Sequence, residues 1–263
     1  MENPVSVLSY GPPGAGKSAF GVSSFWDYQK RELVEGETGR WILLGRESNR
    51  ALAVPEEYVR RIPYEGIGSL SWVDELGKYL RNLAAAAKKG TGPRNIVFDG
   101  WSEFSAGFEI AYKAVHNPSN KFETWGQWRE KFFETVQLLD PELLDANIFT
   151  TARVREFKEG QFDADTRKTT GRDPDWLEGL SYPAVDGWAK NNLGNYFNYI
   201  FYHEQGVKMA SVGGKRVGTP TFRLHTLPAG EHLVKNISAH MWDGRAVMEN
   251  TSWPDVQKII AGG

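Results

Sequence analysis

The first part of the chain alternates between short apolar runs and longer stretches in which apolar residues recur at helical spacing. A short run of this kind predicts a buried strand, and a longer periodic stretch predicts an amphipathic helix. Within 69–89, for example, Leu70, Val73 and Leu76 repeat at helical spacing, and Ser69 is placed to cap the helix. The predicted strands are 4–9, 40–45, 58–64, 95–99 and 146–152, and the predicted helices are 17–30, 69–89, 101–115 and 124–140.

The last third of the chain has a different pattern. Residues 153–181 are polar, rich in Gly, Asp, Thr and Arg, and show little periodicity, so they predict a mobile loop. The segment that follows, 183–195, predicts a helix. The aromatic run 196–203 predicts a buried strand rather than a platform for nucleic-acid bases. Further along, 213–218 predicts a hairpin turn, and 221–227 and 231–237 predict strands.

Strands that alternate with helices are typical of an α/β fold with a mostly parallel central sheet and helices on both faces. We therefore expect a single domain over residues 1–263, in which 196–240 adds a β-rich C-terminal extension to the same sheet. In such a sheet, ligands bind outside the carboxyl ends of the strands. Polar residues that directly follow the predicted strands are therefore the first candidates for a site.

The composition narrows the classes of function. The formal net charge is −2, so any site for a polyanion must be a local patch. No cysteine is present, which excludes disulfides, thiolate zinc sites and cysteine nucleophiles. No apolar run reaches the roughly 18–20 residues of a membrane span. The five histidines have no metal-ligand spacing and are expected to be ordinary structural or surface residues: His116, His203, His225, His232 and His240.

Residues 11–18 fit the P-loop pattern G-x-x-x-x-G-K-[ST]. Glycines let successive backbone N–H groups turn inward around a phosphate, and the helix expected to follow begins with unpaired N–H groups. Lys17 would place its ammonium group on the β- and γ-phosphates, and Ser18 would offer a hydroxyl to Mg²⁺. The predicted nucleotide-binding residues are Gly11, Pro12, Pro13, Gly14, Ala15, Gly16, Lys17, Ser18 and Ala19.

Acidic residues at the ends of two other predicted strands complete the candidate site. Asp99 ends the apolar strand 95–99, where a carboxylate would support the Mg²⁺ ion beside the P-loop. Hydrolysis also needs a group that orients or activates water. Glu47, just past the strand 40–45, and Glu103, just past Asp99, are the two candidates, and each has the alternative of being an ordinary solvated glutamate.

Three further stretches, WILLGRESNRAL, NIVFDGWSEF and LVKNI, resemble segments of the phage RecA-like P-loop ATPases, the AAA-domain or Sak-type single-strand annealing proteins. The resemblance implies a RecA-like core, ATP with Mg²⁺ as cofactors, single-stranded DNA as partner, and a homo-oligomer that forms a ring or filament. It also implies a catalytic role for Glu47, γ-phosphate sensing by Thr151, and contact of Lys235 with a neighbouring subunit's nucleotide. The absence of an N-K-x-D element favours adenine over guanine.

The resemblance places DNA contacts in the loop after Thr151. Residues 152–172 hold a small excess of basic over acidic side chains, which would give salt-dependent contacts to phosphates. Phe157 and Phe162 are available to stack on bases. The alternative is a solvated disordered loop with no DNA contact. The predicted DNA-binding residues are Arg153, Arg155, Lys158, Arg167, Lys168 and Arg172.

Two functions remain open at this point. One is a DNA-stimulated, Mg²⁺-dependent ATPase that promotes annealing or strand exchange in phage recombination or replication. The other is an accessory module that uses ATP as a switch for a protein partner, such as a helicase or packaging factor, with little turnover. A small-molecule kinase is disfavoured because no arginine-dense segment resembles a lid. Either function implies a cytoplasmic protein, in the bacterial host cell if the chain is phage-encoded, with no membrane partner.

Overall fold

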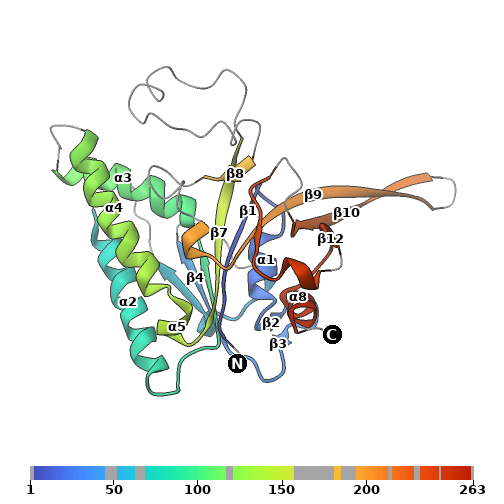
Figure 1. Ribbon diagram of the computed structural model, residues 1–263, viewed down its shortest axis with the longest axis horizontal. Coiled ribbons are helices and arrows are strands. Elements are labelled where there is room, and N and C mark those ends of the chain that lie inside the picture. Colours follow the sequence, from blue (N-terminus) through green and yellow to red (C-terminus); the bar gives the residue numbers. More distant parts are fainter. Residues whose placement is uncertain are drawn as a thin grey trace.

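A ten-stranded, mostly parallel mixed sheet with helices packed on it gives the described chain an α/β fold (Figure 1). The α/β class expected from the sequence is therefore confirmed. The computed structural model describes residues 3–44, 52–62, 69–116, 121–156, 181–184, 194–212, 215–227, 232–242 and 244–261.

Six strands run parallel through the middle of the sheet, in the order β5-β4-β6-β7-β1-β9. Their bounds are β1 Ser6–Gly11, β4 Gly39–Leu44, β5 Val59–Ile62, β6 Asn95–Asp99, β7 Asn147–Glu156 and β9 Tyr199–Val212. Antiparallel strands extend it: β10 (Lys215–His225) and β12 (Val247–Glu249) continue beyond β9, β11 (Lys235–Asn236) pairs with β9, and β8 (Ser181–Pro183) pairs with β7.

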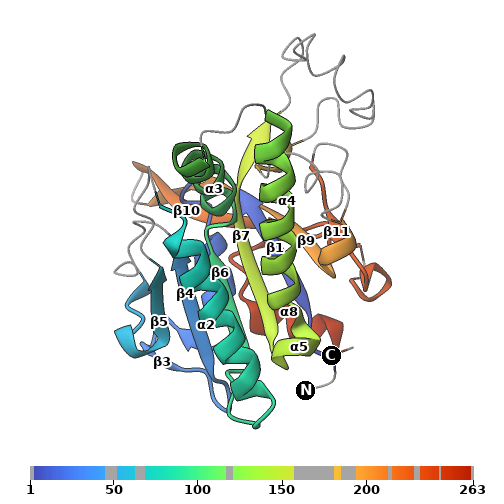
Figure 2. The same cartoon turned by 90° about the vertical axis from the view of Figure 1, so that its left-hand side faces the viewer.

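Helices cover both faces of the sheet, and each face has its own apolar core. Figure 2 shows α2 (Ser71–Ala87) and α4 (Lys121–Leu138) side by side on one face, with α3 (Trp101–His116) packed at the upper part of α4 and the short α5 (Pro141–Leu144) following α4. The other face is covered by α1 (Lys17–Val22) and α8 (Trp253–Ile260), with short 3-10 turns at Glu56–Tyr58 and Ala239–Met241 elsewhere in the chain. Central strands are thus buried on both sides, which explains their continuous apolar sequences.

Strands β9 and β10 form a long hairpin that projects well beyond the helices (Figure 1). Its base, where His225 pairs with Tyr202, belongs to the central sheet. Its outer part leaves two apolar side chains open to solvent, Val207 at 60% and Met209 at 58% exposure. We call this outer part, Gly206–Val212 with Lys215–Pro220, the arm.

The helix predicted over 17–30 is wrong beyond Val22. The chain turns there, and Trp26–Asp27 (β2) pairs with Glu32–Leu33 (β3) in a two-stranded hairpin. Phe25 and Trp26 are both buried, next to Trp41 in the core on the α1 face. The turn instead lets the backbone N–H of Val34 donate a hydrogen bond to the Phe25 carbonyl oxygen at 2.9 Å, with both aromatic side chains buried.

Three other predictions need correction at their boundaries. Residues 153–156, expected to begin the mobile loop, continue β7, and 157–180 lie outside the described residues. Residues 215–218, expected in a hairpin turn, belong to β10, because the hairpin is longer than its apolar pattern indicates. Of the segment 231–237, only Lys235–Asn236 forms a strand. The start of the helix predicted over 183–195 is wrong, because Pro183 is the last residue of β8. Residues 185–193 of this predicted helix lie outside the described part of the chain.

None of the helices in the described part of the chain combines the length and the apolar character needed to cross a bilayer.

Candidate functional site

The glycine loop, residues 11–18, joins β1 to α1 at the carboxyl edge of the central sheet. Strand β1 lies between β7 and β9, so the loop is flanked by the ends of two parallel strands. Gly11 is in register with Arg153 of β7, and Tyr10 is in register with Tyr202 of β9. The loop therefore lies at the edge where ligands bind in open parallel sheets.

The backbone of this loop depends on glycine at specific positions. Gly14 and Gly16 have φ values of 76° and 85°, in the region that side chains disfavour. Gly11 has a φ of 155° and packs against β9, where an added Cβ would lie 2.1 Å from the carbonyl oxygen of His203. A side chain at Gly11 would thus push the loop off the neighbouring strand.

Lys17 turns its ammonium group back over the loop. Its Nζ donates hydrogen bonds to the carbonyl oxygens of Gly11, at 3.0 Å, and Pro12, at 2.8 Å. These bonds hold a positive charge against the backbone at the start of the loop. An anion bound in the turn would meet this charge directly, and a charge-assisted bond to it would be stronger than the bonds to neutral carbonyls.

Asp99 is buried at the end of β6 on the face of the sheet that α1 covers. Its Oδ1 accepts a hydrogen bond from Thr151 Oγ1, and its Oδ2 accepts one from Trp41 Nε1 at 3.2 Å. Alternation along β6 puts Asp99 on the same side as Val97, which lies under Gly21 of α1. The carboxylate and the start of α1 therefore occupy the same side of the sheet edge.

Glu103 and Arg153 form an ion pair at the same edge of the sheet, where Arg153 is in register with Gly11. Glu103 lies in the first turn of α3, and its side chain is only 17% exposed, whereas that of Arg153 is 64% exposed. The backbone N–H of Arg153 also donates to Ser102 Oγ at 2.9 Å. The pair thus joins the end of β7 to the start of α3.

The base of the β9–β10 hairpin forms one wall of the loop. A Cβ added at Gly16 would lie 3.2 Å from the Phe222 ring, and one at Gly14 would lie 3.6 Å from Gln205 Oε1. His203, which is fully buried, has its pKa lowered to about 3 by burial, with the charge of Lys17 acting in the same direction. It is therefore a neutral packing group, and its ring contacts that of Phe20.

Lys235 lies apart from this edge. It is the first residue of β11 and pairs with Ile200 of β9. Ile200 lies nearer the start of β9 than His203 and Gln205, the β9 residues that contact the glycine loop. Its Nζ donates to the carbonyl oxygens of Gly194 and Phe197, and burial lowers its pKa. Within this chain Lys235 does not join the other predicted site residues.

The described edge therefore brings together Lys17, Ser18, Asp99, Thr151, Glu103 and Arg153. The predicted residues Glu47, Lys158, Arg167, Lys168 and Arg172 lie outside the described residues. Arg155 belongs to β7, opposite Tyr182 of β8.

Residues of the hairpin wall were missed by the sequence analysis. His203, Gln205 and Phe222 lie about two hundred positions after the glycine loop, and they carry no motif. Trp41, which bonds Asp99, was identified only as part of a buried strand. A sequence alone offers no signal for these contacts, because they arise from which strands become neighbours.

No protein-family model matches this chain, and a search of curated proteins finds no relative of it.

Proposed function

We propose that this chain binds and hydrolyses ATP with Mg²⁺ and acts on single-stranded DNA, in annealing or strand exchange, as a RecA-like ATPase. The observation that carries the proposal is the glycine loop at the end of the central strand β1, with the Lys17 ammonium group folded over it. Backbone amides, flexible glycines and one cation are the groups that surround a polyphosphate in P-loop proteins.

The residues at the sheet edge fit Mg²⁺ as well as phosphate. Ser18 offers a hydroxyl at the start of α1, and Asp99 offers a carboxylate that two hydrogen bonds hold in position. Oxygen ligands of this kind, completed by waters and phosphate oxygens, suit Mg²⁺. When bound, Mg²⁺ would neutralise charge on the phosphates.

The protein's own groups would have separate roles. Lys17 would leave the carbonyl oxygens of Gly11 and Pro12 and bond to the phosphates. Thr151 would hold Asp99 in place through its hydrogen bond. Glu47 and Glu103 are the candidates that orient water, and Glu103 would first have to exchange its bond to Arg153 for one to water.

The position of β7 supports the RecA-like interpretation. This strand lies between β1 and β6, so Thr151 is in register with Asp99 on one side and with Ser9, two residues before the glycine loop, on the other. A group there can respond to the γ-phosphate and to the metal ligand together. Strand β7 also carries Arg153 at the mouth of the site, where a DNA phosphate can reach an exposed guanidinium group.

Replacing Lys17 by Ala tests the proposal. We expect ATP affinity to fall by at least about tenfold, since one charged hydrogen bond contributes about 1.5–3 kcal/mol. Lys89→Ala is the matched control, because Lys89 is an exposed lysine just past the end of α2. Calorimetric titration with ATP and Mg²⁺ measures both variants. Unchanged affinity in the Lys17 variant would refute nucleotide binding at this loop.

A nucleotide-dependent switch for a protein partner is the second candidate. The arm favours it, because Val207 and Met209 are apolar and exposed, and they follow directly on the residues that wall the glycine loop. Substitution of Glu47 by Gln separates the two functions. It should abolish turnover and preserve ATP binding if Glu47 activates water in an ATPase. It should change little in a switch that turns over negligibly.

A further inference from the structure

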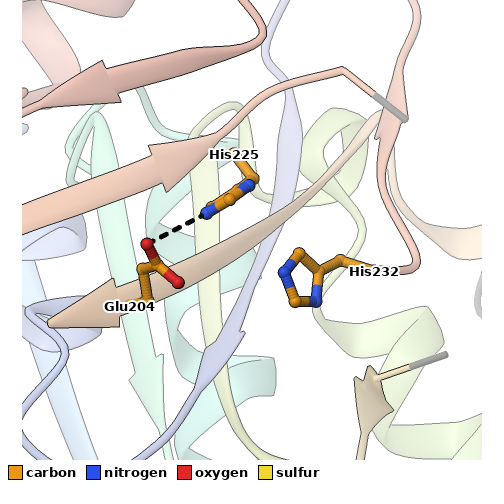
Figure 3. Close-up of side chains that lie close together, drawn as sticks. All are labelled: Glu204, His225 and His232. Atoms are coloured by element: carbon orange, nitrogen blue, oxygen red, sulfur yellow. Dashed lines mark ion pairs between the residues drawn. The ribbon is translucent and has the colours of Figure 1, made fainter. Parts of the chain in front are cut away.

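Two histidines and a glutamate meet at the base of the β9–β10 hairpin, on the face of the sheet opposite α1 (Figure 3). Glu204 belongs to β9, His225 ends β10, and His232 follows the connection after β10. One ligand atom from each residue lies within 4.8 Å of the other two. The sequence spacing gave no sign of this group.

The positions of the three side chains follow from the strand register. Tyr202 pairs with His225 and Glu204 pairs with Arg223, so residues 202, 204, 223 and 225 share one face. His232 is fixed separately. Its ring stacks on Tyr202 with centroids 3.7 Å apart, and it forms a β-bridge with Ser181.

The environment of His225 points to a ligand. Both of its ring nitrogens are buried, and neither has a hydrogen-bond partner among the described residues. Its Nε2 lies 3.7 Å from Glu204 Oε1, a distance that gives an ion pair only if the imidazole is protonated. A buried polar atom without a partner costs free energy, and a metal ion at this position would remove that cost.

We propose that Glu204, His225 and His232 bind a divalent transition-metal ion, with Zn²⁺ as the preferred ion. Two imidazoles and one carboxylate are a typical zinc ligand set, with water in the fourth position. Ligands at about 2.0–2.2 Å from zinc lie about 3.4 Å from one another, so the separations, which are 4.8 Å or less, must shorten by at most about 1.4 Å. Rotation of the Glu204 side chain, together with a small shift of the hairpin base towards His232, would have to supply this movement.

Arg223 competes for Glu204. Its Nη1 lies 3.0 Å from Glu204 Oε1, and its Nε lies 3.5 Å from Glu249 Oε1. Because Glu249 remains as a partner, Arg223 keeps an ion pair when Glu204 turns to the metal. Moving Glu204 from Arg223 to the metal therefore still leaves the Arg223 guanidinium group paired with the Glu249 carboxylate.

The metal would clamp both strands of the hairpin to the segment that follows them. It would join β9, β10 and residue 232 directly beside His203, the residue whose carbonyl oxygen packs against Gly11. Metal binding that requires the folded arrangement adds its free energy to folding. The site is independent of the proposed nucleotide site, which lies on the glycine loop and uses oxygen ligands.

Zinc titration of the purified full chain, prepared without a polyhistidine tag, tests this proposal. We expect one Zn²⁺ per chain, a higher Tm with zinc, and retained binding in excess Mg²⁺, because imidazole favours zinc over magnesium. Co²⁺ in place of Zn²⁺ should give the visible bands of a tetrahedral site. His225→Ala, His232→Ala and Glu204→Gln should each weaken binding more than about 100-fold, beyond the roughly 10–100-fold of an outer-shell change.

His116→Ala and His240→Ala are the matched controls, since both histidines are exposed and neither belongs to the group. They should leave stoichiometry and affinity unchanged, and Lys17→Ala should do the same. Circular dichroism confirms that each variant is folded. The proposal is overturned if the wild-type chain binds no zinc, if its Co²⁺ spectrum is octahedral, or if folded variants of the three residues bind zinc as the wild type does.

Discussion

Thr151 Oγ1 donates a hydrogen bond to Asp99 Oδ1 between neighbouring strands, with the two residues directly in register. Both side chains are buried at the carboxyl edge of the sheet. The other carboxylate oxygen of Asp99 accepts a hydrogen bond from Trp41 of β4, the neighbouring strand on the other side of β6. Side chains from β4, β6 and β7 therefore meet in one polar cluster. This cluster fixes the acid expected to support Mg²⁺.

Thr151→Val removes this bond and keeps the shape of the side chain. Loss of this hydrogen bond to a buried carboxylate should lower the free energy of unfolding by about 1–3 kcal/mol. ATP turnover should fall as well, because Asp99 is then held only by its hydrogen bond from Trp41. Urea denaturation and a turnover assay measure the two effects.

Thr151→Ser keeps the hydroxyl and is the control for that change. We expect it to retain most of the turnover, with only the small loss of stability that follows from one missing methyl group. Equal losses of turnover in the Ser and Val variants would show that the hydroxyl is not the group that matters.

Gly11→Ala tests the close approach of the glycine loop to β9. The new Cβ would meet the His203 carbonyl oxygen, so we expect a loss of about 2–4 kcal/mol in stability together with loss of ATP binding. Gly36→Ala is the comparison, because Gly36 has a φ of 74° and open space around its Cβ position. It should cost about 1–2 kcal/mol from backbone strain alone and leave ATP binding intact. Similar effects at both glycines would contradict the steric argument.

Arg153→Ala tests the exposed end of β7. Because its side chain is 64% exposed, loss of the ion pair to Glu103 should change stability by less than about 1 kcal/mol. Affinity for single-stranded DNA should fall, and the dependence of log affinity on log salt should become shallower by about one unit. Fluorescence anisotropy at several salt concentrations measures both quantities.

Arg94→Ala controls for general loss of positive charge. Arg94 is also exposed, but it precedes β6 and so lies at the opposite edge of the sheet. It should leave DNA affinity unchanged. If both variants weaken DNA binding equally, the DNA contact at Arg153 is not specific.

Several elements followed from local pattern alone. The strand Asn95–Asp99 and the helix Ser71–Ala87 match their expected positions closely, because a continuous apolar run and a helical repeat each have one favourable way to be buried. The expected helix after the glycine loop ended early, since Phe25 and Trp26 gain more from the core than the helix gains from continuing. The local periodicity of a sequence does not show whether burial of an aromatic pair or continuation of a helix is the more favourable.

The sequence by itself determined the glycine loop between a buried strand and a helix, and the acid at the end of a second strand. These features depend only on residues that are close together along the chain, so the sequence alone is enough to predict them. Only the tertiary structure decided that β9 lies against β1, that Thr151 bonds Asp99, and that Glu204, His225 and His232 meet. Strand pairing uses backbone hydrogen bonds that nearly every residue type can make, so the sequence does not specify which distant strands become neighbours.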